Sequence, residues 1–200
     1  ILGGAGALTS GAAGAVTIAG GTPVDGNGGS VNLSASNGVR TNRNGGNVVL
    51  TSGAPTGSGV PGIVNVVSTM AIKAALETIT ITATGPPAPT NFDLLTQGIQ
   101  YYTTNASANF TLNIRGSSSI SLDSVLAVGQ SATINLLVTN GATPYYPTAY
   151  QIDGGAVTPK WITGTAPTGG NASSIDLYTL TIIKTGAAAF TVLASQTKYA

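Results

Sequence analysis

Gly46-Asn47-Val48-Val49-Leu50 is one copy of a five-residue unit, Gly-x-β-x-β, in which β is an aliphatic residue. The aliphatic residues that close successive copies, from Ile18 to Val66, lie 15, 17 and 16 residues apart. A regular spacing of this kind indicates a repeat architecture. Leu2 lies one spacing before Ile18, so we expect the chain to begin inside a repeat. The other copies are Gly14-Ala15-Val16-Thr17-Ile18, Gly29-Ser30-Val31-Asn32-Leu33 and Gly62-Ile63-Val64-Asn65-Val66.

Each copy predicts a short strand, because aliphatic residues alternate with other residues, followed by an arm rich in Gly, Ser, Thr, Asn and Pro. One strand face offers only two aliphatic side chains, so neighbouring copies must stack to form a core. A single strand in each copy suits three chains around a shared axis, in a trimeric β-helix-like or prism-like stalk. The predicted trimer core consists of Val16, Ile18, Val31, Leu33, Val48, Leu50, Val64 and Val66.

Aromatic residues mark where this region ends. All eleven aromatic residues lie at or after Phe92, whereas 17 of the 28 glycines lie at or before Gly62. Large aromatic side chains supply much of the buried area of ordinary cores, so the first region must bury its aliphatic side chains by stacking repeats or by packing against other chains. We therefore predict a stalk over residues 1–67, a connector over 68–91 and a tip domain over 92–200.

The sequence of the connector, residues 68–91, indicates both a helix and a strand. Residues 70–76 could form two helical turns, and Ile79-Thr80-Ile81-Thr82-Ala83 alternates like a strand. Gly85-Pro86-Pro87-Ala88-Pro89 breaks both patterns and predicts a stiff hinge before the tip.

The tip is predicted to be all-β, because short alternating runs are separated by Asn-Gly, Asp-Gly and Gly-Gly turn signals. Strands at this spacing favour a small β-sandwich or a jelly-roll-like fold. The predicted strands span 92–95, 99–103, 109–114, 119–122, 132–139, 150–152, 157–162, 175–184 and 189–194.

Composition excludes several classes of function. Only 6% of residues are charged and the net charge is +1, with no cluster of basic residues that could displace counterions from nucleic acid. The absence of Cys and His removes disulfides, Cys/His metal sites and the commonest general base. No run is long enough to insert into a membrane. We predict no metal and no cofactor.

The residues also argue against an enzyme. The six acidic residues are isolated in sequence, and Asp25 and Asp153 each precede a glycine, as turn residues do. Paired carboxylates for glycoside hydrolysis could arise only through folding or trimerisation. Serine-based hydrolysis lacks its histidine. The prediction is a non-enzymatic protein.

Tyr145, Tyr146 and Tyr150 form the most notable polar aromatic cluster, with Lys160 and Trp161 following in sequence. Tyrosine rings stack on sugars, so these three residues are the candidate receptor-binding site. The alternative is that the rings fill the core of the tip or the trimer axis, and for Trp161 the core is the favoured reading.

Residues 92–200 resemble the C-terminal module of many tailed-bacteriophage fibre proteins. The resemblance rests on Leu126-Ala127-Val128-Gly129-Gln130-Ser131, on Pro159-Lys160-Trp161 with Gly164-Thr165-Ala166-Pro167, and on Asn171-Ala172-Ser173-Ser174-Ile175-Asp176. It implies a homotrimeric virion structural protein, assembled in the host cytoplasm, that contacts other virion proteins and a host surface glycan. Fibre tips with similar frameworks bind different ligands, so the resemblance does not identify a receptor for this chain.

Three alternatives stay open beside a receptor-contacting fibre. They are a purely structural virion protein on the capsid surface, a bacterial surface adhesin and an enzyme. Adsorption to host cells distinguishes the first from the fibre, and secretion or sorting signals in a longer gene would favour the second.

Overall fold

The structure is a computed structural model that describes residues 16–22, 24–25, 27, 29–37, 41–54 and 59–199. The chain divides into two units, Ile1–Thr51 and Ser52–Ala200. The starts of the first repeat and of the chain, including Gly14 and Leu2, lie outside the described residues.

The described chain is mostly β-structure with almost no helix, which confirms the all-β prediction. Ten strands form two sheets, a six-stranded sheet in the order β1-β3-β5-β9-β10-β8 and a four-stranded sheet in the order β2-β4-β6-β7. Their bounds are β1 Ile79–Thr82, β2 Thr90–Asp93, β3 Ile99–Tyr102, β4 Phe110–Arg115, β5 Ser131–Thr139, β6 Pro147–Ile152, β7 Gly155–Val157, β8 Lys160–Trp161, β9 Ile175–Gly186 and β10 Ala189–Tyr199.

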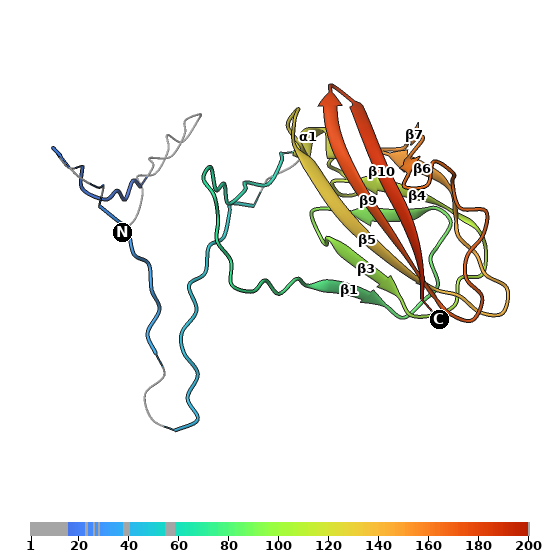
Figure 1. Ribbon diagram of the computed structural model, residues 1–200, viewed down its shortest axis with the longest axis horizontal. Helices are drawn as coiled ribbons and strands as arrows, with labels where there is room; N and C mark the ends of the chain where they lie inside the picture. The colour runs from blue at the N-terminus through green and yellow to red at the C-terminus, as the bar shows by residue number, and fades with distance from the viewer. Residues whose placement is uncertain are drawn as a thin grey trace. The chain divides into compact units, whose positions relative to one another are not determined.

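The first six strands alternate between the two sheets along the chain (Figure 1). Parallel neighbours need a long crossover, and here each crossover runs through a strand of the opposite sheet. As a result β1 pairs with β3, β3 with β5, β2 with β4 and β4 with β6, all in parallel. These parallel pairs depart from the antiparallel order of a jelly roll. The long strands β9 and β10 then form an antiparallel hairpin beside β5.

Side chains from both sheets form one core. Burial alternates strictly along β4, where Phe110, Leu112 and Ile114 are buried and the residues between them are half-buried. Along β9 the same alternation buries Tyr178, Leu180 and Ile182. Period-two alternation places these residues on the inner face of each sheet, as expected for strands with one covered face.

The sheets begin inside the segment predicted as a connector. Strand β1 pairs with β3, and the proline-rich residues 85–89 join β1 of one sheet to β2 of the other. The predicted hinge is therefore a crossover between sheets, with Pro86 buried. Residues 70–76 form no helix, because Met70, Ile72 and Leu76 are all exposed and a short helix needs tertiary packing to be stable.

One predicted strand, 119–122, is also wrong. Its last residue begins α1, a helical turn over Leu122–Val125 with Ser121 as its N-cap. The Ser121 hydroxyl accepts a hydrogen bond from the Ser124 backbone N–H at 3.1 Å. Serine at this position satisfies an otherwise unpaired backbone donor, which favours a turn of helix over an extended strand.

In the repeat region the arms are closed by a recurring backbone hydrogen bond. Gly29 donates to the Gly21 carbonyl at 3.0 Å, Gly46 to Ser36 at 2.8 Å and Gly62 to Gly53 at 3.0 Å. In each case the donor is the glycine that opens a Gly-x-β-x-β unit. The described residues from 16 to 66 contain no strand within the single chain. In its described residues the repeat region therefore consists of arms, each closed by one backbone hydrogen bond, joined by segments that pair with no strand.

Candidate functional site

The structure separates the three candidate tyrosines. Tyr145 and Tyr146 lie in the loop between β5 and β6 and are half-buried against the core. Their backbone N–H groups donate to the side-chain oxygens of Asn140 and Asn109, at 2.9 Å and 3.1 Å. Tyr150 lies in β6 and is only 8% exposed. A ring buried in this way cannot stack on a sugar, so Tyr150 belongs to the core.

Tyr150 packs against Trp161 with the ring centroids 5.6 Å apart and the planes at 67°, an edge-to-face contact. Burial raises the pKa of the Tyr150 hydroxyl, so this group stays protonated at neutral pH. Trp161 is half-buried at the edge of the core, in agreement with the core reading of this residue.

Beside Trp161 a groove of about 330 Å³ lies between the 162–169 loop and β10. Gln196 fastens this loop, since its amide donates to the Gly169 carbonyl and to the Tyr178 hydroxyl, both at 3.1 Å. At the other end Gly164 turns the chain at a φ of +75°, a conformation that favours glycine. The groove is lined by Trp161, Ile162, Thr163, Thr165, Ala166, Pro167, Thr168, Gly169, Gln196 and Lys198.

The lining of this groove combines an aromatic ring, an exposed isoleucine and several hydroxyls with a single charge, that of Lys198. Such a surface offers stacking and neutral hydrogen bonds but little long-range electrostatic attraction. Its chemistry fits a neutral polyhydroxylated ligand. Trp161 of the sequence motif lines this groove. Of the three candidate tyrosines, Tyr150 is buried in the core, and none of the three lines the groove.

Gln196 of the groove is linked through the Tyr178 hydroxyl to a buried polar network that the sequence interpretation missed. Asp176 is fully buried, and its Oδ2 accepts hydrogen bonds from the Asn140 side chain at 3.1 Å and the Asn171 backbone at 3.0 Å. Burial raises the pKa of the Asp176 carboxyl. The sequence does contain a signal for the burial of Asp176. In the alternation of β9, Asp176 lies on the same face as Tyr178, Leu180 and Ile182.

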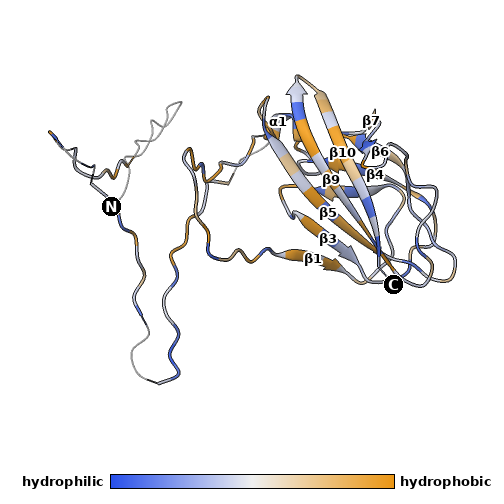
Figure 2. Cartoon of the chain, viewed as in Figure 1, coloured by the Kyte–Doolittle hydropathy of each residue, from blue (hydrophilic) through white to orange (hydrophobic). Residues whose placement is uncertain are grey.

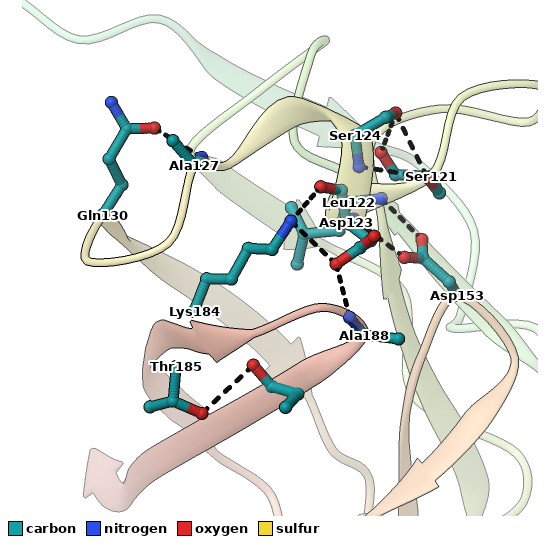
Figure 3. Close-up of polar contacts among 11 residues, drawn as sticks. Ser121, Leu122, Asp123, Ser124, Ala127, Gln130, Asp153, Lys184, Thr185 and Ala188 are labelled. Carbon is teal, nitrogen blue, oxygen red and sulfur yellow. Dashed lines mark hydrogen bonds and ion pairs between the residues drawn. The ribbon is translucent and has the colours of Figure 1, made fainter.

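Folding brings two carboxylates together at α1 (Figure 3). Asp153 accepts the backbone N–H groups of Leu122 and Asp123, at 2.7 Å and 3.0 Å. Asp123 pairs with Lys184 at 2.8 Å and accepts the Ala188 N–H at 2.8 Å. Hydrogen bonding to Lys184 lowers the pKa of the Asp123 carboxyl. Both carboxylates therefore have a structural role: they hold α1 against the β6–β7 and β9–β10 turns.

The remaining charged pair lies on the four-stranded sheet, where Arg115 contacts Asp93 at 2.5 Å. Among the described residues no three His, Cys, Asp or Glu side chains gather in a way that could hold a metal ion. No helix in the described part of the chain has the length and apolar character needed to cross a membrane.

Comparison of the chain with protein-family models, with curated proteins and with solved structures found no match. The case for a function therefore rests on the residues and their geometry.

Proposed function

We propose that this chain is a non-enzymatic segment of a bacteriophage virion fibre, a homotrimer with a repeat stalk and a tip that contacts a neutral host-surface glycan. One observation carries the proposal. All eight aliphatic residues predicted for the trimer core are exposed in the single chain, by between 45% and 66%. Apolar residues exposed at a regular spacing indicate a surface that other chains cover.

The closed arms support a shared stalk. Each arm returns the chain to the start of the next Gly-x-β-x-β unit through one glycine-donated hydrogen bond. The unpaired backbone of the units is then available for pairing with other chains, as in a trimeric β-helix or prism. Three chains would bury the aliphatic rows along one axis, with the two-sheet region forming a sandwich-like tip.

The groove beside Trp161 supports a glycan as the ligand. Single weak sites become effective when a fibre presents three of them to one cell surface. The ring of Trp161 and the hydroxyls of Thr163 and Thr165 supply the contacts, and Lys198 supplies the only charge.

The test uses the intact chain, an array of neutral bacterial surface oligosaccharides and a panel of bacterial cells. We expect binding that survives high salt and falls at least tenfold in an Ile162→Ala, Thr165→Ala double variant. Both residues are exposed, so the variant should fold. Thr148→Ala, an exposed change on β6, is the matched control.

The outcomes separate the alternatives. An assembled chain that binds no cell or glycan would support a purely structural virion role. Binding that both variants leave unchanged would reject the Trp161 groove. Loss of wild-type binding in high salt would reject a neutral sugar.

A further inference from the structure

The two sheets carry contrasting outer faces. On the four-stranded sheet, the outward positions hold the Asp93–Arg115 ion pair and an amide hydrogen bond from Asn113 to Asn91 at 2.9 Å. This is the polar pattern of a solvated sheet face. On the six-stranded sheet the pattern is different.

The outward positions of β1, β3, β5, β9 and β10 hold no charged residue. The charged residues of β9 and β10 lie on the inner alternation instead, with Asp176 and Lys184 buried and Lys198 opposite Asp176. The one charge at the outer face of this sheet is Lys160, on the edge strand β8 opposite Leu193. The outward positions of β1 and β3 hold only isoleucine and tyrosine, and those of β5, β9 and β10 hold Ser, Thr and Asn together with apolar residues such as Leu137, Leu177 and Leu193.

The strand register turns part of this face into an apolar row. Ile81 lies beside Tyr101, Tyr101 beside Leu137, and Leu137 beside Leu177, across four neighbouring strands. Ile81 is 66% exposed and Leu193, on the far side of the sheet, is 45% exposed. Figure 2 shows apolar colouring on β1. Charge depletion with exposed apolar residues is the compositional mark of an interface core.

We infer that this outer face of the six-stranded sheet packs against other copies of the same chain, so that the trimer interface continues from the stalk into the tip. The inference rests on the proposed homotrimer. Two features favour a second copy over a different partner. A nearly neutral face meets itself without repulsion between like charges, whereas a charged partner would bury unpaired charges. The face is also continuous along the chain with exposed apolar residues of the same unit, since Met70, Ile72 and Leu76 lead directly into β1.

The absence of cysteine from the chain allows a direct test with single cysteines. Ile81→Cys and Leu193→Cys place a thiol on the outer face of the six-stranded sheet. Ala149→Cys places one at an exposed outward position of β6, on the other sheet. The full-length variants are treated with a polyethylene glycol maleimide, and the mass of each assembly is measured in the same sample.

We expect Ile81→Cys and Leu193→Cys to react at least tenfold more slowly than Ala149→Cys in the assembled protein. A second variant pair, Thr179→Lys against Thr111→Lys, tests the same face without a thiol. Thr179→Lys should weaken association, and Thr111→Lys, on the outer face of the four-stranded sheet, should leave it unchanged.

The results separate this inference from the proposal beneath it. If the protein is a trimer but both face thiols react as fast as Ala149→Cys, the interface is confined to the stalk and the inference is wrong. Unchanged association in Thr179→Lys would count against it in the same way. If the chain is a monomer, the proposed homotrimer fails and this inference fails with it.

Discussion

The repeat region and the two-sheet region differ in how far a single chain buries their apolar side chains. Residues 79–199 enclose Leu112, Tyr178 and Leu180 between two sheets and so have a core within one chain. Residues 16–66 expose their aliphatic rows and, in their described part, form no strand. The core of the two-sheet region should form within a single chain, whereas burial of the aliphatic rows in the repeat region should require partner chains.

The largest expected effect is a charge in the aliphatic rows. Leu50→Asp should abolish assembly, because each trimer would bury three unpaired carboxylates near its axis. Val49→Asp is the control, since period-two alternation predicts that Val49 faces away from the axis when Leu50 faces it. Analytical size-exclusion chromatography with light scattering measures both. Equal behaviour of the two variants would contradict the axial placement of Leu50.

A cavity in the two-sheet core should act differently. Leu180 is fully buried on β9 between Ile134 and Ala194 on the neighbouring strands. Leu180→Ala should lower the free energy of unfolding by about 2–5 kcal/mol. Val128→Ala, at a residue that is 62% exposed, should change it by no more than about 0.5 kcal/mol.

Denaturant unfolding at two protein concentrations sharpens the comparison. The loss caused by Leu180→Ala should be the same at both concentrations, because the core lies within one chain. A loss that grows on dilution would show that the core of the two-sheet region also depends on partner chains.

The stability of the two-sheet region should depend on pH in part through the carboxyl group of Asp176. Burial raises the pKa of this carboxyl in the folded chain, so its protonated form is favoured on folding. The contribution to stability is then fully present below the unfolded pKa and is lost as pH rises through the folded pKa. Asp176→Asn removes this dependence.

We therefore expect Asp176→Asn to gain stability relative to the wild type as pH rises above the unfolded value for Asp, about 3.9. Thermal unfolding from acid to neutral pH measures the difference. A stability difference that does not change with pH would contradict a raised pKa at Asp176.

The smallest effect concerns a single arm of the repeat region. A Cβ atom added at Gly29 would lie 2.8 Å from the Gly21 backbone nitrogen, whereas one added at Gly21 meets nothing within 4 Å. Gly29→Ala should open the hydrogen bond from residue 29 to the Gly21 carbonyl, and Gly21→Ala should keep it. Amide hydrogen exchange of residue 29 in the assembled protein is the measurement, with faster exchange expected only in Gly29→Ala. Unaltered protection would mean that this bond does not close the arm.

Local patterns in the sequence identified most of the strands. The predicted strand 109–114 matches β4, and 175–184 matches most of β9, because period-two alternation and turn residues are local signals. The alternation of strands between two sheets depends on crossovers between distant residues and has no local signature. The same is true of the burial of Tyr150, for which the sequence leaves both a binding role and a core role open.

The candidate site was also predictable only where its residues lie close together in the sequence. The stretch from Lys160-Trp161 to Pro167 is recognisable as a motif in the sequence, and its residues Trp161, Thr165 and Pro167 line the groove beside β10. The loop that forms its other wall is fastened by Gln196 and Lys198, which come from a strand more than twenty residues later and gave no signal of their own.

Sedimentation equilibrium of the intact chain at micromolar concentration tests the central claim most directly. The account predicts a single species with the mass of three chains, because the aliphatic rows from Val16 to Val66 are buried only on assembly. A stable, folded monomer at this concentration would contradict it.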